Sequence, residues 1–376
     1  MKFGLFMYCT IGRRGELEAG MAGRRPELYQ RMLDEIATYA RFADQNGYFG
    51  YGHPEHHLQI EGFEISNDPC LMAMWLGSHT ESLKVITCGF VSTTNNPLQT
   101  AEKIATLDQM LKGRFGVGLV RGYQARWVEN FKVKPELNAV GPWNNKTEAD
   151  DINREYFYEF VDVVTTALAR ETFSYKGKYW QFPPENFINP HDHPVYRTLG
   201  KGVDDNMRVS EIGIAPRPFQ DRIPLYGGFT GSLTTAKFWA RYRGRPIVLS
   251  DNEEFLQALW HEWEEEAKSH GHTDIRPGDQ ACWGGIMHCA ETDEQAWREF
   301  ADMEWFWKTW PTPFGQGMPG LLVGSPDTIN KTIERCRKAV PIDESFLLFP
   351  QGILPPDQVL SSLDLFARKV MPNHQD

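Results

Sequence analysis

Four titratable side chains directly follow a short apolar segment near the start of the chain. Residues 48–52 predict a buried strand, and the segment His53-Pro54-Glu55-His56-His57 comes immediately after it. A histidine titrates near neutral pH and can act as a general base, a hydrogen-bond donor or a metal ligand. The alternative is a polar loop with solvated imidazoles, since histidines are often partly exposed without a role. The cluster predicts chemistry at the end of this strand.

A basic side chain stands at the end of another predicted strand. Asn96 can cap a helix, Pro97 suits its first turn, and Gly113 ends it. The apolar face of this helix is predicted to hold Ile104, Leu107, Met110 and Leu111. Residues 115–120 then form an apolar run without alternation, which is typical of a parallel strand covered on both faces. Arg121 is therefore presented where such sheets place their chemistry.

The elements that position these groups alternate along the chain. The candidate strands are residues 2–8, 48–52, 84–91, 115–120, 223–228, 246–250, 281–289 and 345–349, and helical patterns between them include 26–46, 152–170, 252–269 and 355–370. Eight such repeats predict an α/β fold, a (β/α)8 TIM barrel, with the active site at the C-terminal ends of the strands. We expect one domain over residues 1–376, with excursions at about 131–150, 172–222 and 300–320.

Aromatic residues gather in the last of these excursions. They are Trp305, Phe306, Trp307, Trp310 and Phe314. Such rings can wall an apolar substrate pocket or close over it as a lid. Alternatively, the rings only pack this insertion onto the barrel, and the sequence favours neither interpretation.

Composition narrows the range of partners. The chain has 376 residues, is 41% hydrophobic and carries a formal net charge of -11, which argues against nucleic acid and against an anionic membrane surface. No apolar run approaches the ~20 residues that span a bilayer. Six cysteines without a C-x-x-C motif suit a reducing cytosol, so we expect a cytoplasmic protein.

Short motifs follow one another along nearly the whole chain. They are E-H-H at 55–57, N-D-P at 67–69, A-E-x-x-A-x-L-D-Q-M-x-K-G-R-F at 101–115, R-G at 121–122, G-S-L-T-T at 231–235 and V-G-S-P at 323–326. In these motifs and their order the chain resembles the bacterial luciferase family of flavin-dependent monooxygenases. The motifs between residues 55 and 122 are highly specific, and the later ones are short and moderately so.

The resemblance implies a two-component monooxygenase that uses FMN as FMNH2. Reduced flavin and molecular oxygen would form a C4a-(hydro)peroxyflavin, which transfers one oxygen atom to a small, largely apolar organic substrate, with an aldehyde or ketone favoured. A separate NAD(P)H:flavin reductase is the expected partner, because no G-x-G-x-x-G fingerprint follows a first strand. The family also implies a homodimer through helices near 68–79 and 97–112.

The resemblance also assigns site residues. It makes His56 the active-site histidine, with Glu55 orienting it or bracing the loop. It places a cis peptide beneath the flavin between Cys88 and Gly89, and it ends the arginine strand in Arg121 and Gly122. The implied cofactor contacts are Arg121, Ser232 and Thr235 at the phosphate, with Cys88, Gly89 and Gly122 near the flavin.

Two positions differ from the family's pattern, and two of the implied phosphate contacts have an alternative role. The reactive cysteine of luciferase is Val120 here, which argues against light emission, and the family's acidic residue before the serine is Gly231. Arg121 can make paired charge-assisted bonds to a phosphate, and Ser232 and Thr235 can open a helix where an anion is favoured. Ordinary helix capping is the alternative for these two hydroxyls.

Three other functions compete with this prediction. An F420-dependent oxidoreductase of the same superfamily would transfer hydride and would not need the E-H-H triplet. A metal-dependent hydrolase would draw ligands from His53, His56, His57, His191 and His193, but the spacing of the first three is no established zinc signature, and we expect no metal. A non-catalytic flavin-binding accessory protein is the third, although the presence of both His56 and Arg121 argues against it.

Overall fold

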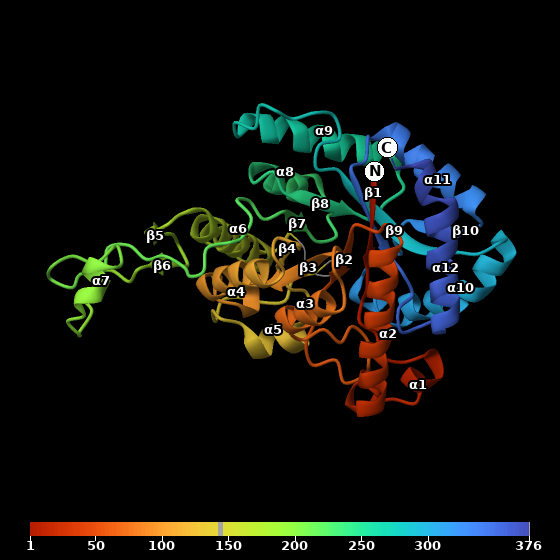
Figure 1. Ribbon diagram of the computed structural model, residues 1–376, viewed down its shortest axis with the longest axis horizontal. Coiled ribbons are helices and arrows are strands. Elements are labelled where there is room, and N and C mark those ends of the chain that lie inside the picture. The colour runs from red at the N-terminus through yellow and green to blue at the C-terminus, as the bar shows by residue number, and fades with distance from the viewer. Residues whose placement is uncertain (142–145, 376) are drawn as a thin grey trace. The chain divides into compact units, whose positions relative to one another are not determined.

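Eight parallel strands close into a barrel in the computed structural model, which describes residues 1–141 and 146–375 (Figure 1). In ring order they are β1 (Lys2–Phe6), β2 (Gly50–His53), β3 (Lys84–Val91), β4 (Phe115–Val120), β7 (Leu225–Gly227), β8 (Arg245–Val248), β9 (Cys282–Cys289) and β11 (Glu344–Leu348). Pairing of β8 with β9 and of β11 with β1 closes the ring. The predicted (β/α)8 barrel is confirmed.

Helices follow most of these strands, as the sequence pattern indicates. The longer ones are α2 (Pro26–Gln45), α3 (Pro69–Ser78), α4 (Pro97–Met110), α6 (Glu148–Ala169), α8 (Leu233–Arg241), α9 (Glu253–Ser269), α10 (Asp293–Thr309), α11 (Pro326–Ala339) and α12 (Pro356–Lys369). Short helices are α1 (Arg14–Glu18), α5 (Ala125–Phe131) and α7 (Pro194–Thr198). Both chain ends lie together, where the Met1 ammonium donates to the His374 carbonyl at 2.6 Å.

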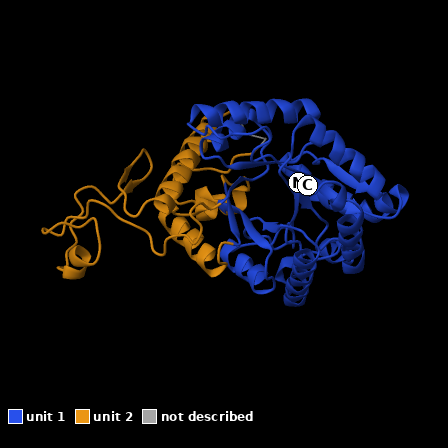
Figure 2. Cartoon of the chain, turned by 45° about the horizontal axis from the view of Figure 1, so that its top comes forward, with its two compact units in different colours: residues 1–90, 114–119, 224–376 blue, residues 91–113, 120–223 orange. Residues whose placement is uncertain are grey.

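The chain divides into two compact units (Figure 2). Unit 1 comprises Met1–Phe90, Arg114–Leu119 and Pro224–Asp376, and it contains almost all of the barrel strands. Unit 2 comprises Val91–Gly113 and Val120–Ile223, with helices α4 to α7. The prediction of a single domain stays a prediction.

The helix before β4 has the predicted ends. The Asn96 side chain accepts hydrogen bonds from the Leu98 and Gln99 amides, and Gly113 adopts a φ of 82°. One predicted core residue is wrong, because Met110 is 57% exposed. Met110 lies six positions after Ile104, which turns it about 120° away from that residue on the helix.

The three predicted excursions differ from one another in structure. In the first, residues 132–141 form no helix or strand, and residues 142–145 lie outside the described residues. The second contains the hairpin of β5 (Tyr175–Lys176) and β6 (Gln181–Phe182) and then α7. The third is the end of α10 and a 3-10 turn, η4 (Thr312–Phe314), followed by β10 (Leu321–Gly324), which the sequence did not predict. Strand β10 pairs with the second half of β9.

The lengths and hydropathies of the described helices bear on membrane insertion. Across residues 1–141 and 146–375, none combines the length and the apolar character that a bilayer-spanning helix needs.

Candidate active site

Three residues of the histidine cluster are buried at the C-terminal end of β2. His53 is the last residue of the strand, its Nδ1 lies 3.3 Å from the Pro54 carbonyl oxygen, and burial lowers its pKa to about 4. Glu55 and His56 are buried beyond it. The solvated-loop interpretation is therefore wrong for His53 and His56. A buried imidazole with so low a pKa stays neutral, so His53 packs in the core.

His56 is fixed through both its backbone and its ring. Its N–H donates to the Ser66 carbonyl at 2.9 Å in an antiparallel bridge. Its Nδ1 lies 3.3 Å from Glu64 Oε2. Burial lowers the pKa of His56 below its usual value, while the Glu64 charge acts in the opposite direction. The ring is therefore neutral at neutral pH and can accept a proton.

The buried carboxylate next to His56 belongs to Glu64, a residue that sequence reasoning missed. Glu64 is 1% exposed, and its Oε2 accepts the Trp310 indole N–H at 2.8 Å. Glu55 contacts the third member of the triplet instead, with 2.9 Å between its Oε1 and His57 Nε2. The available signal for Glu64 is its place between Phe63 and Ile65, since an acid between two large apolar residues is unusual.

The predicted aromatic cluster lies in unit 1, with buried rings from other elements. Phe306 and Trp307 of α10 lie 5.9 and 6.0 Å, between ring centroids, from Tyr8 just after β1. Trp310 stacks on Phe63 with centroids 5.0 Å apart. The rings thus pack on Tyr8 after β1 and on Phe63 after the E-H-H loop, and Trp310 also contacts Glu64.

The third strand holds the expected cis peptide. The bond between Cys88 and Gly89 is cis, which confirms that implication of the resemblance. A Cβ at Gly89 would overlap the Gly118 carbonyl of β4, so only glycine fits there. Burial raises the pKa of the Cys88 thiol to about 12, which keeps that thiol protonated.

Arg121, in unit 2, is paired with a buried carboxylate that it shares with a second arginine. Arg121 Nη1 lies 2.6 Å from Asp150 Oδ1, and Arg154 Nη2 lies 2.6 Å from Asp150 Oδ2. Burial opposes ionisation of Asp150, but the Lys146 N–H and the two guanidinium groups hold its pKa below the usual value. The Asp150 side chain is 2% exposed, whereas those of Arg121 and Arg154 are 34% and 30% exposed.

This arrangement leaves a surplus of positive charge. Two guanidinium groups face one carboxylate, and about a third of each arginine side chain is exposed. Sequence reasoning missed Arg154. The available signal is the i, i+4 spacing from Asp150 to Arg154, although Asp150 precedes the helix predicted over 152–170. In the structure both residues lie on α6, which begins at Glu148.

The backbone at Arg121 requires the glycine that follows it. Gly122 has a φ of 96°, and a Cβ there would lie 2.8 Å from both Thr93 Oγ1 and Val91 Cγ1. The Thr93 hydroxyl donates to the Arg121 carbonyl at 2.9 Å. Val120 packs against an apolar cluster that includes Trp127. These contacts fix the chain at Arg121 without engaging its side chain.

Ser232 and Thr235, in unit 1, open helix α8. Ser232 is the N-cap residue, and its Oγ accepts the Thr235 N–H at 3.3 Å and lies 2.9 Å from Thr235 Oγ1. Ser232 is exposed and Thr235 is half-buried. They have the geometry of an ordinary cap, and this helix N-terminus also suits an anion.

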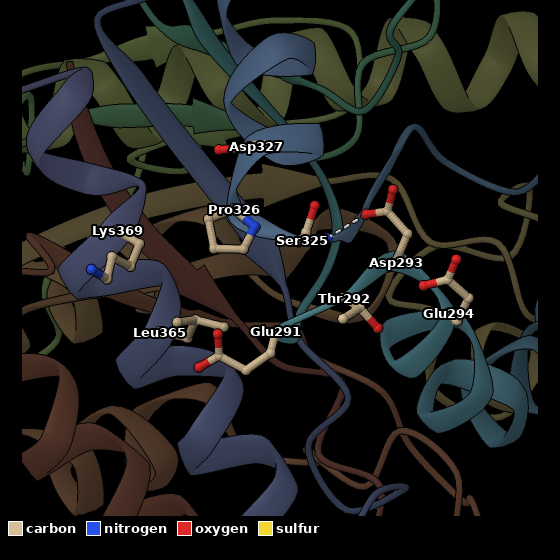
Figure 3. Close-up of a pocket in the computed structure, with 9 residues that line it drawn as sticks. All are labelled: Glu291, Thr292, Asp293, Glu294, Ser325, Pro326, Asp327, Leu365 and Lys369. Atoms are coloured by element: carbon tan, nitrogen blue, oxygen red, sulfur yellow. Dashed lines mark hydrogen bonds between the residues drawn. The ribbon is translucent and has the colours of Figure 1, made fainter.

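A surface pocket of about 460 Å³ lies elsewhere in unit 1, at the start of α10 and α11 (Figure 3). Its lining residues are Glu291, Thr292, Asp293, Glu294, Ser325, Pro326, Asp327, Leu365 and Lys369. Four carboxylates and one ammonium do not suit an anionic flavin phosphate, and none of these residues is a predicted site residue. Among residues 1–141 and 146–375, no three His, Cys, Asp or Glu side chains gather as metal ligands do.

Comparison with known proteins points to one family. The sequence profile of the family described as luciferase-like monooxygenase matches residues 1–318. The chain is 22% identical over 311 residues to 3,6-diketocamphane 1,6-monooxygenase of Pseudomonas putida, which covers 74% of this chain and 76% of that protein.

Two solved structures show how widely the fold is shared. One is a type II Baeyer-Villiger monooxygenase from Pseudomonas putida, described as the oxygenating constituent of 3,6-diketocamphane monooxygenase in complex with FMN. It has a TM-score of 0.71, is 19% identical, and the match covers 100% of this chain and 99% of that one. The other is an F420-dependent secondary alcohol dehydrogenase, with a TM-score of 0.63, 15% identity and coverage of 100% and 99%.

Proposed function

The chain belongs to the luciferase-like monooxygenase family, and from this premise we propose that it is a two-component, FMNH2-dependent monooxygenase. It would transfer one atom of molecular oxygen to a small, largely apolar organic substrate and reduce the other to water. The observation that carries the proposal is a buried, neutral histidine at the C-terminal end of a barrel strand, where barrel enzymes have their active sites.

The residues present fit a flavin phosphate. Arg121 and Arg154 share one carboxylate and keep partly exposed donors, so a phosphate can accept charge-assisted bonds from both. Ser232 and Thr235 are a second proposed set of contacts, at the start of α8. We propose that Cys88, Gly89 and Gly122 lie near the flavin. A Cβ at Gly89 would overlap the Gly118 carbonyl, and the positive φ of Gly122 fixes the backbone that presents Arg121. When bound and reduced, the flavin supplies the two electrons that activate oxygen.

The chain's own residues would manage the proton and the water. His56 is neutral and takes up or returns one proton, which is the task of a general base. Glu55 holds His57 and so braces the loop that carries His56. We propose that Trp310, which contacts Glu64 and stacks on Phe63, helps to exclude water beside His56. We favour an aldehyde or ketone substrate, because the relative named for a diketone resembles this chain over most of its length.

The proposed partners follow from the same reasoning. A separate NAD(P)H:flavin reductase would supply the reduced flavin, since the solved relative is described as an oxygenating constituent. We also propose a homodimer that uses α3 and α4. Each of these helices exposes a large apolar side chain, Leu71 on α3 and Met110 on α4.

Isotopic labelling tests the proposed reaction directly. The protein, FMN, a separately purified flavin reductase and NADH are incubated under heavy-isotope dioxygen with a panel of aldehydes and ketones. The proposal expects one product that has gained a single labelled oxygen atom, and the reductase with FMN alone is the control. If no carbonyl compound acquires label above that control, the substrate class proposed here is wrong.

The pH dependence of oxygen transfer follows from the state of His56. Burial lowers its pKa below 6.5, so the neutral base is present at neutral pH and is lost as the pH falls through that lower value. We expect kcat/KM to be level near pH 7 and to decline only on the acidic side, with a midpoint below 6.5. A rate profile from pH 4.5 to about 8 measures this. A midpoint above 6.5 would show that another group is titrating.

A second candidate is an F420-dependent oxidoreductase. The specific observation in its favour is that an F420-dependent alcohol dehydrogenase shares the fold over the full length of the chain. Such an enzyme would transfer hydride to or from its substrate without consuming oxygen. Oxygen uptake in the presence of reduced flavin distinguishes the two, and a protein inert with either cofactor would be the accessory flavin-binding protein.

A further inference from the structure

We propose that Glu64 is a positioning residue that fixes the ring orientation, the tautomer and the proton affinity of His56. The inference rests on the proposed function, in which His56 handles a proton. Glu64 stands eight residues after His56 and outside the E-H-H motif. The contacts that point to this role lie within unit 1.

Glu64 lies close to the His56 ring and is buried with it. Glu64 Oε2 lies 3.3 Å from His56 Nδ1, and the Glu64 side chain is 1% exposed. At 3.3 Å the contact is an ion-pair distance rather than a well-aligned hydrogen bond, and such contacts often shorten when an active site is occupied. A carboxylate facing Nδ1 favours the tautomer that carries its proton on Nδ1, which leaves Nε2 as the proton acceptor.

The position of Glu64 is itself fixed by contacts of its side chain and backbone. Its Oε2 accepts the Trp310 indole N–H at 2.8 Å. Its backbone adopts the left-handed conformation, with a φ of 52°, which is rare for a residue with a side chain. Two residues later, Ser66 bonds the His56 backbone. Strained residues of this kind persist where the surrounding structure holds them, and they cluster at functional sites.

Glu64 is the charged side chain that acts most strongly on the His56 ring. Burial first, and then the Glu64 charge, raise the pKa of Tyr8 well above its usual value and that of Cys9 to about 12, so both stay neutral. Glu55 is engaged by His57 at 2.9 Å. Among the charges that act on His56, Glu64 has a larger effect than His57 or Glu55.

Trp310 connects this pair to the aromatic cluster. It donates to the same oxygen that faces His56, and it also stacks on Phe63, the neighbour of Glu64. The segment that follows α10 therefore helps to hold the carboxylate beside His56. A purely structural role for Glu64 would also give these contacts, so the test needs a measurement that such a role would not change.

The experiment uses the flavin-free, full-length protein with nitrogen-labelled histidine. Nitrogen NMR reports the tautomer and the titration midpoint of each imidazole, and a His56→Gln variant assigns the His56 signals. We expect neutral His56 to carry its proton on Nδ1 in the unaltered protein. Finding the proton on Nε2 would overturn the proposal.

Two variants then separate Glu64 from the rest of the loop. Glu64→Gln keeps the shape and removes the charge, so the His56 midpoint should fall by roughly one pH unit, because the imidazolium loses its nearest counter-charge. Glu55→Gln is the matched control, with the same charge change on the same loop, and it should shift the midpoint by clearly less. An unchanged midpoint in folded Glu64→Gln, or an equal shift in both variants, would contradict the proposal.

Trp310→Phe provides a milder variant if Glu64→Gln fails to fold, because it removes the indole donor alone. We expect the His56 midpoint to shift in the same direction by a smaller amount.

The turnover of the Glu64→Gln variant is a second measurement, independent of the NMR result. We expect Glu64→Gln to lower kcat for oxygen transfer about tenfold with little change in KM, and to move the acidic limb of the rate profile to lower pH. The NMR measurements need neither flavin nor turnover. A protein with the expected tautomer and midpoints but no oxygen transfer would therefore refute the proposed function and leave the positioning role intact.

Discussion

Replacement of His56 by Ala is expected to lower oxygen transfer by roughly a hundredfold or more, the usual cost of losing a general base. FMN binding should stay nearly intact, because the proposed phosphate contacts come from Arg121, Arg154, Ser232 and Thr235. The rate of labelled product formation at saturating substrate measures the first effect. Fluorescence titration with FMN measures the second.

The neighbouring histidine is the matched control for this experiment. His57 lies on the same loop and is paired with Glu55, so His57→Ala removes an imidazole without removing the proposed base. We expect its effect on turnover to be at least tenfold smaller than that of His56→Ala. Unchanged turnover in His56→Ala, with the protein folded by circular dichroism, would remove His56 from the mechanism.

Replacement of Arg121 by Ala is expected to weaken FMN binding by about 10- to 100-fold, the cost of one or two bonds to a charged group at ~1.5–3 kcal/mol. Binding of riboflavin, which has no phosphate, should change little. Asp150 keeps its contacts with Arg154 and the Lys146 amide, so its carboxylate is not left alone in the protein. Calorimetric titration of both ligands gives the comparison.

Two further variants strengthen the interpretation of the Arg121 result. Arg154→Ala should weaken FMN in the same selective way, because its guanidinium shares the carboxylate. Arg170→Ala removes an exposed arginine just after the same helix and should leave both ligands unaffected. An equal loss of FMN and riboflavin in Arg121→Ala would show that Arg121 supports the fold or the flavin ring.

The barrel could be predicted from the sequence because its signals are local. Strand β4 has the predicted limits, since residues 115–120 form an apolar run between a helix stop and a basic residue. Strand β10 was missed, because four residues paired only to the outer half of β9 give too short a signal. Met110 was misplaced because its hydrophobicity was weighed without its angle on the helix.

The candidate site was only partly predictable, because some of its contacts join residues far apart in the sequence. The chemical types of His56 and Arg121 and their places after strands are visible in one sequence. The residues that set the protonation of His56 and the charge around Arg121 are not visible there. Glu64 is held by Trp310, which lies 246 residues away, and no pattern within a window of residues reports such a contact. Asp150 and Arg154 have a visible spacing, but the burial of Asp150 and its contact with Arg121 require the fold.

The most direct test of the proposed function is stopped-flow absorbance of the protein loaded with FMNH2 without oxygen and then mixed with oxygenated buffer. We expect an absorbing species that is neither reduced nor oxidised flavin, that outlives anything seen with free FMNH2, and that decays faster when a carbonyl substrate is added. Reoxidation to FMN and hydrogen peroxide at the rate seen in buffer alone would contradict it.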